Sequence, residues 1–201
     1  RGQGEGAKEA VRRIDALANR AFTSPMLRGH YPEDLLADTS SVTDWSFVRD
    51  GDLDTICQPL EVLGVNYYST TMVGLWDGIS NKQDHDGHKS SGGTAWPGSD
   101  EVVEFLPQPG PHTAMGWNIA PQGLEELLLS LHEQFPEQPL MVTENGAAFD
   151  DVVGSDGAIR DHARIDYLHT HLLAALRALE AGVDLRGYFA WSLLDNFEWG
   201  Y

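Results

Sequence analysis

The sequence predicts an α/β fold in which parallel strands alternate with helices. Three short apolar segments suited to buried strands are separated by segments whose apolar residues recur at helical spacing, and this alternation favours βα units around a parallel sheet. Each predicted strand also runs directly into polar or aromatic residues. A (β/α)8 barrel or an open α/β sheet carries its functional residues at these carboxyl ends of strands.

The first predicted element is a helix over residues 5–21, which Pro25 and Gly29 are expected to end. Its apolar residues recur at helical spacing and are Val11, Ile14, Leu17, Ala18 and Ala21. A short turn or helix is expected over 33–36. Residues 60–68, with the sequence LEVLGVNYY, are apolar and β-branched enough to form a buried strand.

The middle of the chain is less regular. Gly, Ser, Asp and Pro dominate residues 77–100, which are expected to form a long surface loop, and residues 101–106 are expected to form a short strand. Pro121 suits the first turn of a helix, where its missing N–H leaves no hydrogen bond unmade. The apolar face of this helix consists of Leu124, Leu127, Leu128, Leu131 and Phe135.

The last part of the chain has the clearest pattern. A short strand over 140–143 leads into Glu144, and a helix is predicted over 161–181, with Gly182 as the residue that ends it. The apolar residues that mark this helix are Ile165, Leu168, Leu172, Leu176 and Leu179. A third strand is expected over 185–191.

Charge and composition exclude several classes of protein. The 201 residues include 31 acidic and 13 basic side chains, a formal net charge of −18, which is repulsive for nucleic acid and for an anionic membrane surface. No segment approaches the roughly 20 apolar residues of a membrane-spanning helix. The single cysteine, Cys57, excludes an internal disulfide and fits a reducing compartment such as the cytoplasm. Because the chain begins with Arg1 and not with Met, an upstream signal segment remains an open possibility.

Glu144 is the first candidate for chemistry. It follows a predicted strand and precedes an Asn-Gly pair, so its carboxylate is expected to face the open end of the sheet. There it could serve as a nucleophile, a general base or a metal ligand. The structural alternative is a glutamate that caps the following loop. Of the adjacent Tyr67 and Tyr68 in another strand, at most one is expected to face the same site.

The segment from Trp191 to Trp199, WSLLDNFEW, combines aromatic and acidic side chains after a strand. Tryptophan faces stack on the apolar faces of sugar rings, and the carboxylate of Glu198 can accept hydrogen bonds from hydroxyl groups. The segment therefore suggests a neutral, polyhydroxylated ligand. The alternative is a packed aromatic corner without a binding role.

Other motifs are weaker. Residues 84–88, Asp-His-Asp-Gly-His, lie in a polar, glycine-rich segment without a second group of ligands, so a solvated loop is favoured over a metal site. For the isolated Trp117, packing in a loop is the favoured interpretation. The chain has no glycine motif typical of dinucleotide or phosphate binding. Neither a cofactor nor a metal ion is expected.

Several segments together resemble the signatures of one family, and they occur in that family's order. They are LGVNYY at 63–68, MGW at 115–117, VTENG at 142–146, RIDYL at 164–168 and GYFAWSLLDNFEW at 187–199. The chain thus resembles glycoside hydrolase family 1, the β-glucosidase family. The resemblance extends over nearly the whole chain and is weakest at 77–100.

The resemblance implies a partial (β/α)8 TIM barrel, of which this chain supplies strands six to eight with their helices. Residues 1–201 would then form the C-terminal part of a single TIM-barrel glycosidase domain, incomplete at both ends. In this family the acid/base glutamate lies in an Asn-Glu-Pro motif on strand four, and this sequence contains no such motif. Retaining hydrolysis needs two carboxyl groups, so the isolated chain is expected to be inactive.

The resemblance also implies roles for individual residues. Glu144 would be the nucleophile of a retaining, double-displacement mechanism, and Tyr68 would hydrogen-bond its carboxylate. Trp191 would lie beneath the sugar ring. The remaining substrate-binding residues implied are Asn66 at the cleft wall, Trp117 on the aglycone side, Glu198 at the O4 and O6 hydroxyls, and Trp199 beside it.

The substrates implied are the terminal β-D-glucosyl residues of small β-glucosides or cello-oligosaccharides, with galactosyl or fucosyl residues also within reach. Glu198 disfavours phosphorylated sugars, because a carboxylate repels a phosphate. Two alternatives stay open. One is a truncated, non-catalytic carbohydrate-binding remnant of the same family, and the other is an unrelated α/β domain. The sequence does not predict an oligomeric state.

Overall fold

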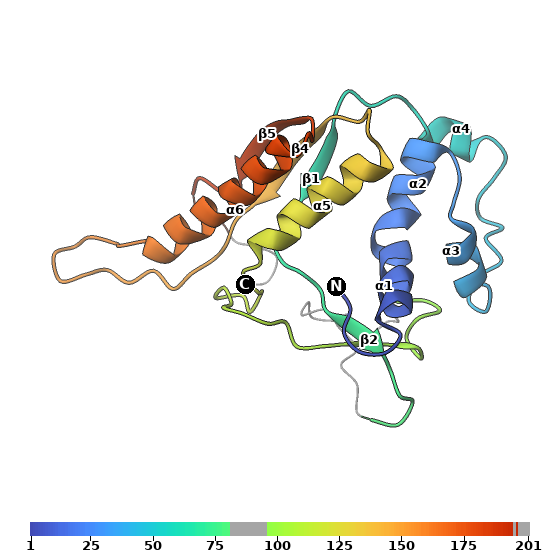
Figure 1. Cartoon of the computed structure of the whole chain (residues 1–201), viewed down its shortest axis with the longest axis horizontal. Helices are drawn as coiled ribbons and strands as arrows, with labels where there is room; N and C mark the ends of the chain where they lie inside the picture. Colours follow the sequence, from blue (N-terminus) through green and yellow to red (C-terminus); the bar gives the residue numbers. More distant parts are fainter. Residues whose placement is uncertain (81–95, 195, 197–201) are drawn as a thin grey trace. The chain divides into compact units, whose positions relative to one another are not determined.

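The computed structural model describes residues 1–80, 96–194 and 196. The chain forms two compact units (Figure 1). Unit 1 comprises Arg1–Pro59 and Thr71–Gln108, and unit 2 comprises Leu60–Thr70 and Pro109–Tyr201. Within the described ranges, no helix combines the length and the apolarity that crossing a bilayer requires.

Unit 1 consists of helices and a small antiparallel sheet. Its helices are α1 (Ala7–Asp15), the π-helical segment η1 (Ala16–Arg20), α2 (Ala21–Arg28), α3 (Glu33–Asp38) and α4 (Asp52–Ile56). Strands β2 (Val73–Leu75) and β3 (Val103–Phe105) pair antiparallel. The helical turn expected over 33–36 and the strand expected over 101–106 are confirmed. The sequence pattern does not predict β2 or α4, which are only three and five residues long.

The first helix is longer than the sequence predicts, and the expectation that Pro25 ends it is wrong. Helical geometry continues through η1 and α2 as far as Arg28, with Pro25 inside α2. Proline removes one backbone donor from a helix, yet Pro25 is accommodated as a buried residue within α2. The helix ends at Gly29, which adopts the left-handed conformation (φ 71°) and donates its N–H to the carbonyl of Pro25 at 3.3 Å.

The core of unit 1 lies between α1 and the small sheet. Ala10 and Ile14 of α1 pack against Val73, Val103 and Phe105. These side chains lie on one face of the helix and on one face of the two strands, because residues four apart in a helix and two apart in a strand share a face. Burial of this cluster therefore fixes α1 on the sheet.

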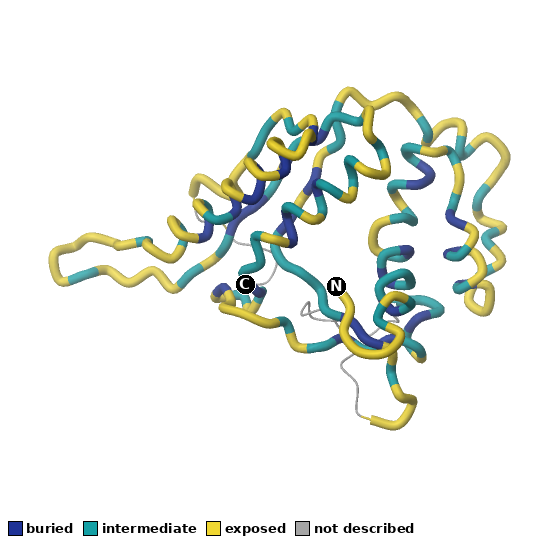
Figure 2. The backbone as a smooth tube through the Cα atoms, in the orientation of Figure 1, coloured by how far each residue is buried: buried dark blue, intermediate teal, exposed yellow. Residues whose placement is uncertain are grey.

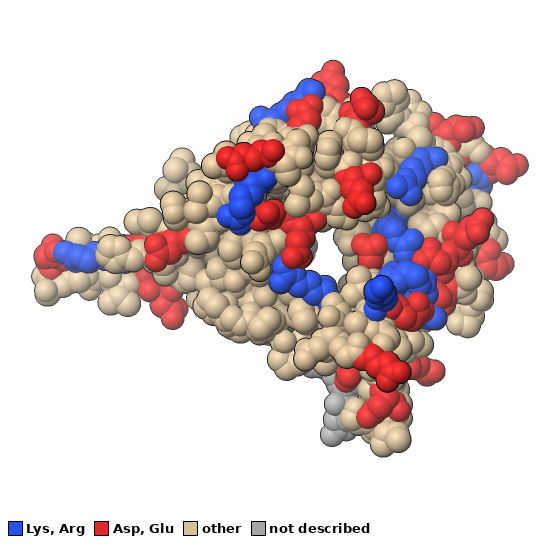
Figure 3. Space-filling view, in the orientation of Figure 1, with Lys and Arg blue, Asp and Glu red and all other residues tan. Residues whose placement is uncertain are grey.

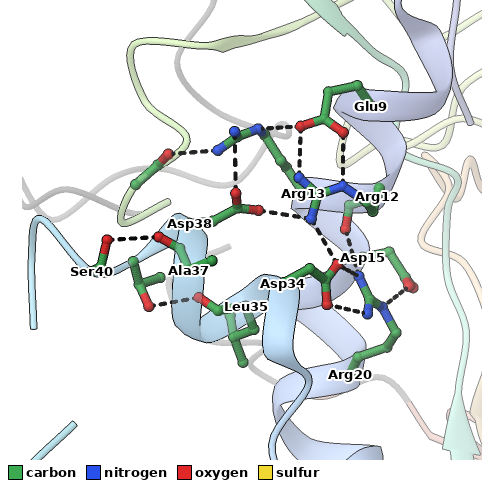
Figure 4. A network of polar contacts seen from close by, with 12 residues as sticks. Glu9, Arg12, Arg13, Asp15, Arg20, Asp34, Leu35, Ala37, Asp38 and Ser40 are labelled. Carbon is green, nitrogen blue, oxygen red and sulfur yellow. Dashed lines mark hydrogen bonds and ion pairs between the residues drawn. The ribbon is translucent and has the colours of Figure 1, made fainter. Parts of the chain in front are cut away.

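Arginines of α1 and η1 form an ion-pair network with carboxylates of α1 and α3 (Figure 4). Its members are Arg12, Arg13, Arg20, Glu9, Asp15, Asp34 and Asp38. Asp34 accepts hydrogen bonds from both Arg12 and Arg20 at 2.7 Å, so α3 is tied to both helical segments. Figure 3 shows acidic side chains next to basic ones in several places on the visible face.

This network lowers the pKa of its carboxyl groups. Hydrogen bonds from Arg20 and Arg12 hold the pKa of Asp34 well below its ordinary value of 3.8. Hydrogen bonds from Arg12 and Arg13 lower the pKa of Glu9 from 4.5 to about 2. Both carboxyl groups bind protons more weakly in the folded protein than in the unfolded chain. Their stabilising contribution is therefore complete above the ordinary pKa and is lost as the pH falls toward the lowered one.

We expect acid to destabilise unit 1 through these groups. The thermal midpoint, followed by circular dichroism, should fall between about pH 4.5 and about pH 2, and it should fall less steeply in Asp34→Asn, which lacks one proton-linked group. Asp54→Asn removes an exposed carboxyl group of the same unit and is the matched control. Equal acid slopes in the two variants would contradict a role for the network.

Unit 2 contains a three-stranded parallel sheet covered by two helices (Figure 1). Its elements are β1 (Leu63–Asn66), α5 (Pro121–Gln134), β4 (Leu140–Asn145), α6 (His162–Glu180) and β5 (Leu185–Ala190). The strand order is β1-β4-β5, and both pairs of strands are parallel. The predicted parallel βα arrangement is therefore confirmed, with element ends that differ from the prediction by a few residues.

The core of unit 2 lies between β4 and the helices α5 and α6. Leu124 and Leu128 of α5 contact Leu140 and Val142 of β4, and Ala178 of α6 joins the same cluster. Figure 2 shows buried residues along β4 and on the sides of α5 and α6 that face it. The apolar face predicted for the helix that begins at Pro121 is thus the face that α5 buries.

Helix α6 buries a different face from the one that its leucines mark. Its buried residues are Tyr167, His171, Ala174, Ala175 and Ala178. Most of the aliphatic residues that predicted the helix are exposed, namely Ile165, Leu172, Leu176 and Leu179. Alanines allow close packing of α6 against α5 and the sheet, and the leucines lie on the opposite side. The helical period was correct, but the period alone does not identify which face is covered.

A pair of leucine substitutions tests this assignment of faces. Leu128→Ala should lower the free energy of unfolding by about 2–5 kcal/mol, because it opens a cavity in the core. Leu172→Ala should change it by less than about 0.5 kcal/mol, because 48% of the Leu172 side chain is exposed. Urea denaturation measures both values. A large loss for Leu172→Ala would mean that this face of α6 is covered.

Candidate active site

The candidate site lies at the carboxyl end of the parallel sheet in unit 2. Glu144 is near the end of β4, the central strand, while Tyr68 follows β1 and Trp191 follows β5. Parallel strands bring their carboxyl ends to the same edge of a sheet. Residues separated by more than a hundred positions in the sequence therefore meet at this edge.

Strand β4 contains one extra residue immediately before the site. Val142 pairs with Val65 on one side and with Tyr188 on the other. Beyond Val142 the next partners are Glu144 with Asn66, and Asn145 with Ala190, so here β4 has one residue more than each neighbour. Before Val142 the shift against β5 has the opposite sense, because Leu140 pairs with Leu185 and Val142 with Tyr188. The extra residue of β4 beyond Val142 is the signature of a β-bulge, which turns the following side chains to the opposite face.

The bulge decides which side chain faces the helices. Leu140 and Val142 are buried on the side of α5 and α6, and strict alternation would place Glu144 on that side as well. Instead Asn145 is buried and Glu144 is half-buried. The extra residue therefore directs the carboxylate of Glu144 away from the helices.

The carboxylate of Glu144 is held by a tyrosine. The hydroxyl of Tyr68 donates a hydrogen bond to Oε2 of Glu144 at 2.6 Å, near the short end of the range for O–H···O bonds. The ring of Tyr68 lies 5.4 Å from that of Trp117, tilted by 60°. Its neighbour Tyr67 points to the other face, where its hydroxyl donates to the carbonyl of Ala120 at 2.6 Å. The adjacent tyrosines thus take opposite faces.

The other candidate residues are distributed around this pair. Asn66 is exposed, and its Oδ1 accepts a hydrogen bond from the hydroxyl of Thr143 at 2.7 Å. Trp191 is 43% exposed, so part of its surface is available to a ligand. Glu198 and Trp199 lie outside the described residues.

Gly146 permits a close approach between two chain segments of the site. A Cβ atom at this position would lie 1.8 Å from the carbonyl oxygen of Trp191, far inside van der Waals contact. The backbone N–H of Trp191 also donates to the carbonyl of Asn145 at 2.9 Å. Because only glycine fits, Gly146 positions the segment that carries Trp191 against the end of β4.

The described residues do not form a metal centre. Among them no group of three or more His, Cys, Asp or Glu side chains could hold a metal ion. The Asp-His-Asp-Gly-His motif at 84–88 lies outside the described residues. His171 is a buried core residue, with Nδ1 at 2.8 Å from the carbonyl of Tyr167, and burial lowers its pKa.

The contribution of Asn145 to this site was not predicted from the sequence. Its side chain is completely buried and hydrogen-bonded to Tyr67, Tyr167 and Tyr188. The available signal was a polar residue at the end of an otherwise apolar strand, directly after the candidate carboxylate. Without the bulge, alternation would have placed this residue on the face away from the helices.

The arrangement has a limited chemical repertoire. A carboxylate oriented by one hydroxyl group can attack an electrophilic carbon or accept a proton. The nearby aromatic rings of Tyr68, Trp117 and Trp191 suit the apolar faces of a sugar more than a charged ligand. Among the described residues, the site thus combines one oriented carboxylate with aromatic rings.

Comparison with known proteins agrees with this description. Residues 2–201 match glycosyl hydrolase family 1. A bifunctional β-D-glucosidase/β-D-fucosidase of Bifidobacterium breve is 50% identical over 200 residues, which cover 98% of this chain and 42% of that protein. The chain therefore spans about two fifths of that relative's length.

Solved structures lead to the same family. A psychrophilic β-glucosidase of Micrococcus antarcticus is 42% identical with a TM-score of 0.87, and the match covers 98% of this chain and 42% of that structure. The family 1 β-glucosidase of Thermotoga maritima in complex with isofagomine lactam is 37% identical with a TM-score of 0.78, over 98% and 40% of the two chains. The chain belongs to glycosyl hydrolase family 1, and its fold is part of a (β/α)8 barrel.

The close approach at Gly146 generates a testable prediction. Gly146→Ala should displace the Trp191 segment and lower the free energy of unfolding by about 1–3 kcal/mol, as overpacking does. Gly187→Ala is the matched control in β5, because its added Cβ meets the flexible side chain of Met141 at 3.2 Å. Denaturation and tryptophan fluorescence report the two effects. Equal behaviour of the variants would contradict the tight contact.

Proposed function

We propose that this chain supplies the nucleophile of a retaining β-glucosidase. The observation that carries the proposal is the hydrogen bond of 2.6 Å from Tyr68 to Glu144 at the end of the central strand. A nucleophilic carboxylate must be aimed at the anomeric carbon, and a hydrogen bond from a hydroxyl group helps to hold it in that orientation. Membership of glycosyl hydrolase family 1 supports the same assignment.

The proposed reaction proceeds in two displacements. Oε of Glu144 attacks the anomeric carbon while the bond to the aglycone oxygen breaks, and a general acid protonates the departing oxygen. Water then attacks the same carbon, gives up a proton to the general base, and releases Glu144 with retention of configuration. The chain contains no Asn-Glu-Pro motif, so the acid/base residue would come from a segment outside these 201 residues.

The proposed substrates are small β-glucosides or cello-oligosaccharides, with galactosides or fucosides as further candidates. Trp191 would stack on the sugar ring, with Asn66 at the cleft wall and Trp117 on the aglycone side. Glu198 would bind the O4 and O6 hydroxyls with Trp199 beside it. The relative from Bifidobacterium breve, named for both glucosidase and fucosidase activity, supports this range.

A cytoplasmic location is part of the same proposal. It is supported by the single cysteine, Cys57, which is a free thiol in the structure.

A second candidate function is a carbohydrate-binding remnant without catalysis. The absence of an Asn-Glu-Pro motif from this chain favours it. The two candidates differ in whether turnover depends on Glu144 when the chain is present in its complete gene product. Sugar binding without turnover would identify the remnant.

The test uses the complete gene product that carries these residues. Glu144→Ala should reduce hydrolysis of an aryl β-glucoside by about 10⁴-fold or more, because the covalent step loses its nucleophile. Azide should restore turnover, because it attacks the anomeric carbon in place of the carboxylate and leaves a glycosyl azide of inverted configuration. Glu133→Ala, an exposed position on α5, is the matched control and should retain full activity.

Two results would contradict the proposal. Unchanged turnover in Glu144→Ala would exclude Glu144 as the nucleophile. Measurable hydrolysis by the purified 201-residue chain alone would exclude the need for an acid/base residue supplied from outside it.

A further inference from the structure

Asn145 follows Glu144 in β4, and its side chain has no solvent exposure (0%). We propose that Asn145 is a positioning residue, whose buried amide fixes the bulge in β4 and thereby aims the carboxylate of Glu144. The proposal rests on the proposed function of Glu144 as nucleophile. It assigns no direct contact between Asn145 and the substrate.

The side-chain amide of Asn145 connects three neighbouring elements. Its Nδ2 donates to the backbone carbonyl of Tyr67, just after β1, at 2.7 Å and to the hydroxyl of Tyr167 on α6 at 3.0 Å. Its Oδ1 accepts a hydrogen bond from the hydroxyl of Tyr188 on β5. Both N–H donors and the carbonyl are thus used, as a buried amide requires.

The backbone around Glu144 is held by the same neighbours. The N–H of Tyr67 donates to the carbonyl of Glu144 at 3.0 Å, and the N–H of Trp191 donates to the carbonyl of Asn145 at 2.9 Å. Side-chain and backbone bonds therefore reach residues 144 and 145 from both adjacent strands. Rotation of this segment would break bonds on both sides.

The amide also favours one of two possible registers of β4, which differ by one residue. A shift by one residue would turn Glu144 toward the helices and Asn145 away from them. That register would bury a carboxylate and leave the amide without Tyr167 and Tyr188. Burial raises the pKa of Tyr188 to about 12, so its hydroxyl stays protonated and can donate. Only the observed register pairs every one of these groups.

Neither a carboxylate nor an apolar side chain can replace the amide. Aspartate has the same shape but lacks the two N–H donors to Tyr67 and Tyr167. Leucine would remove one donor to the Tyr67 carbonyl and the acceptor of the Tyr188 hydroxyl in the interior, which is unfavourable. Tyr188→Phe is the mildest perturbation, because it removes a single hydroxyl group and retains the ring.

The test compares Asn145→Asp and Tyr188→Phe in the complete gene product. Two rates are measured per folded molecule: kcat for an aryl β-glucoside, and covalent trapping of Glu144 by a fluorinated β-glucoside whose glycosyl-enzyme hydrolyses slowly. Both rates should fall together, by about 100-fold for Asn145→Asp, as expected for a misplaced reacting group. For Tyr188→Phe the fall should be about fivefold to tenfold. KM should change by less than about threefold.

The control separates positioning from loss of stability. Thr39 is a buried residue of unit 1, and its hydroxyl donates to the carbonyl of Leu35 at 2.7 Å. Thr39→Val should lower the thermal midpoint without changing kcat or the trapping rate. If Asn145→Asp does not fold, Tyr188→Phe decides the question alone.

Several outcomes would overturn the proposal. Asn145 would be only a core residue if the variants kept kcat and the trapping rate within about twofold while the thermal midpoint fell. A raised KM with unchanged kcat would indicate lost substrate binding and also exclude positioning. A label attached to a residue other than Glu144, or full activity in Glu144→Ala, would instead refute the proposed function on which the inference rests.

Discussion

The extra residue in β4 is the constraint on which the candidate site depends. A strand with strict alternation would direct Glu144 into the helix-facing core, where Leu140 and Val142 are packed. The bulge exchanges the faces, so that a carboxylate reaches the open edge of the sheet and an amide enters the interior. The tyrosines around Asn145 and the hydrogen bond from Tyr68 both require this exchange.

The same constraint explains why the short motif Thr-Glu-Asn-Gly is specific for this arrangement. Each position in the motif has a separate physical role. Thr143 donates to Asn66, Glu144 receives the hydroxyl of Tyr68, and Asn145 pairs with groups on three elements. Gly146 then leaves room for the carbonyl of Trp191. The four residues of this motif therefore depend on the arrangement of three strands and one helix around them.

Much of unit 2 was predictable from the sequence, because its helices and strands are long enough for their apolar periods to be counted. The parallel sheet, both helices and the position of Glu144 at a strand end follow from that pattern. The bulge did not, because it depends on hydrogen bonds to strands that are distant in sequence. The spacing of the α6 leucines did not reveal that they are exposed, and the proline inside α2 was misjudged, for a related reason. Local spacing identifies a helix, whereas its covered face and its true end depend on what packs against it.

The aliphatic side of α6 has a practical consequence. Leu172, Leu176 and Leu179 present branched hydrocarbon to water along one side of a helix of 19 residues. Hydrocarbon exposed in this way is sensitive to the solvent, since excluded salts such as sulfate strengthen apolar association whereas urea weakens it. The choice of precipitant or storage buffer therefore affects this side of the helix. Ammonium sulfate would promote self-association through it, and a mild non-ionic detergent would oppose that association.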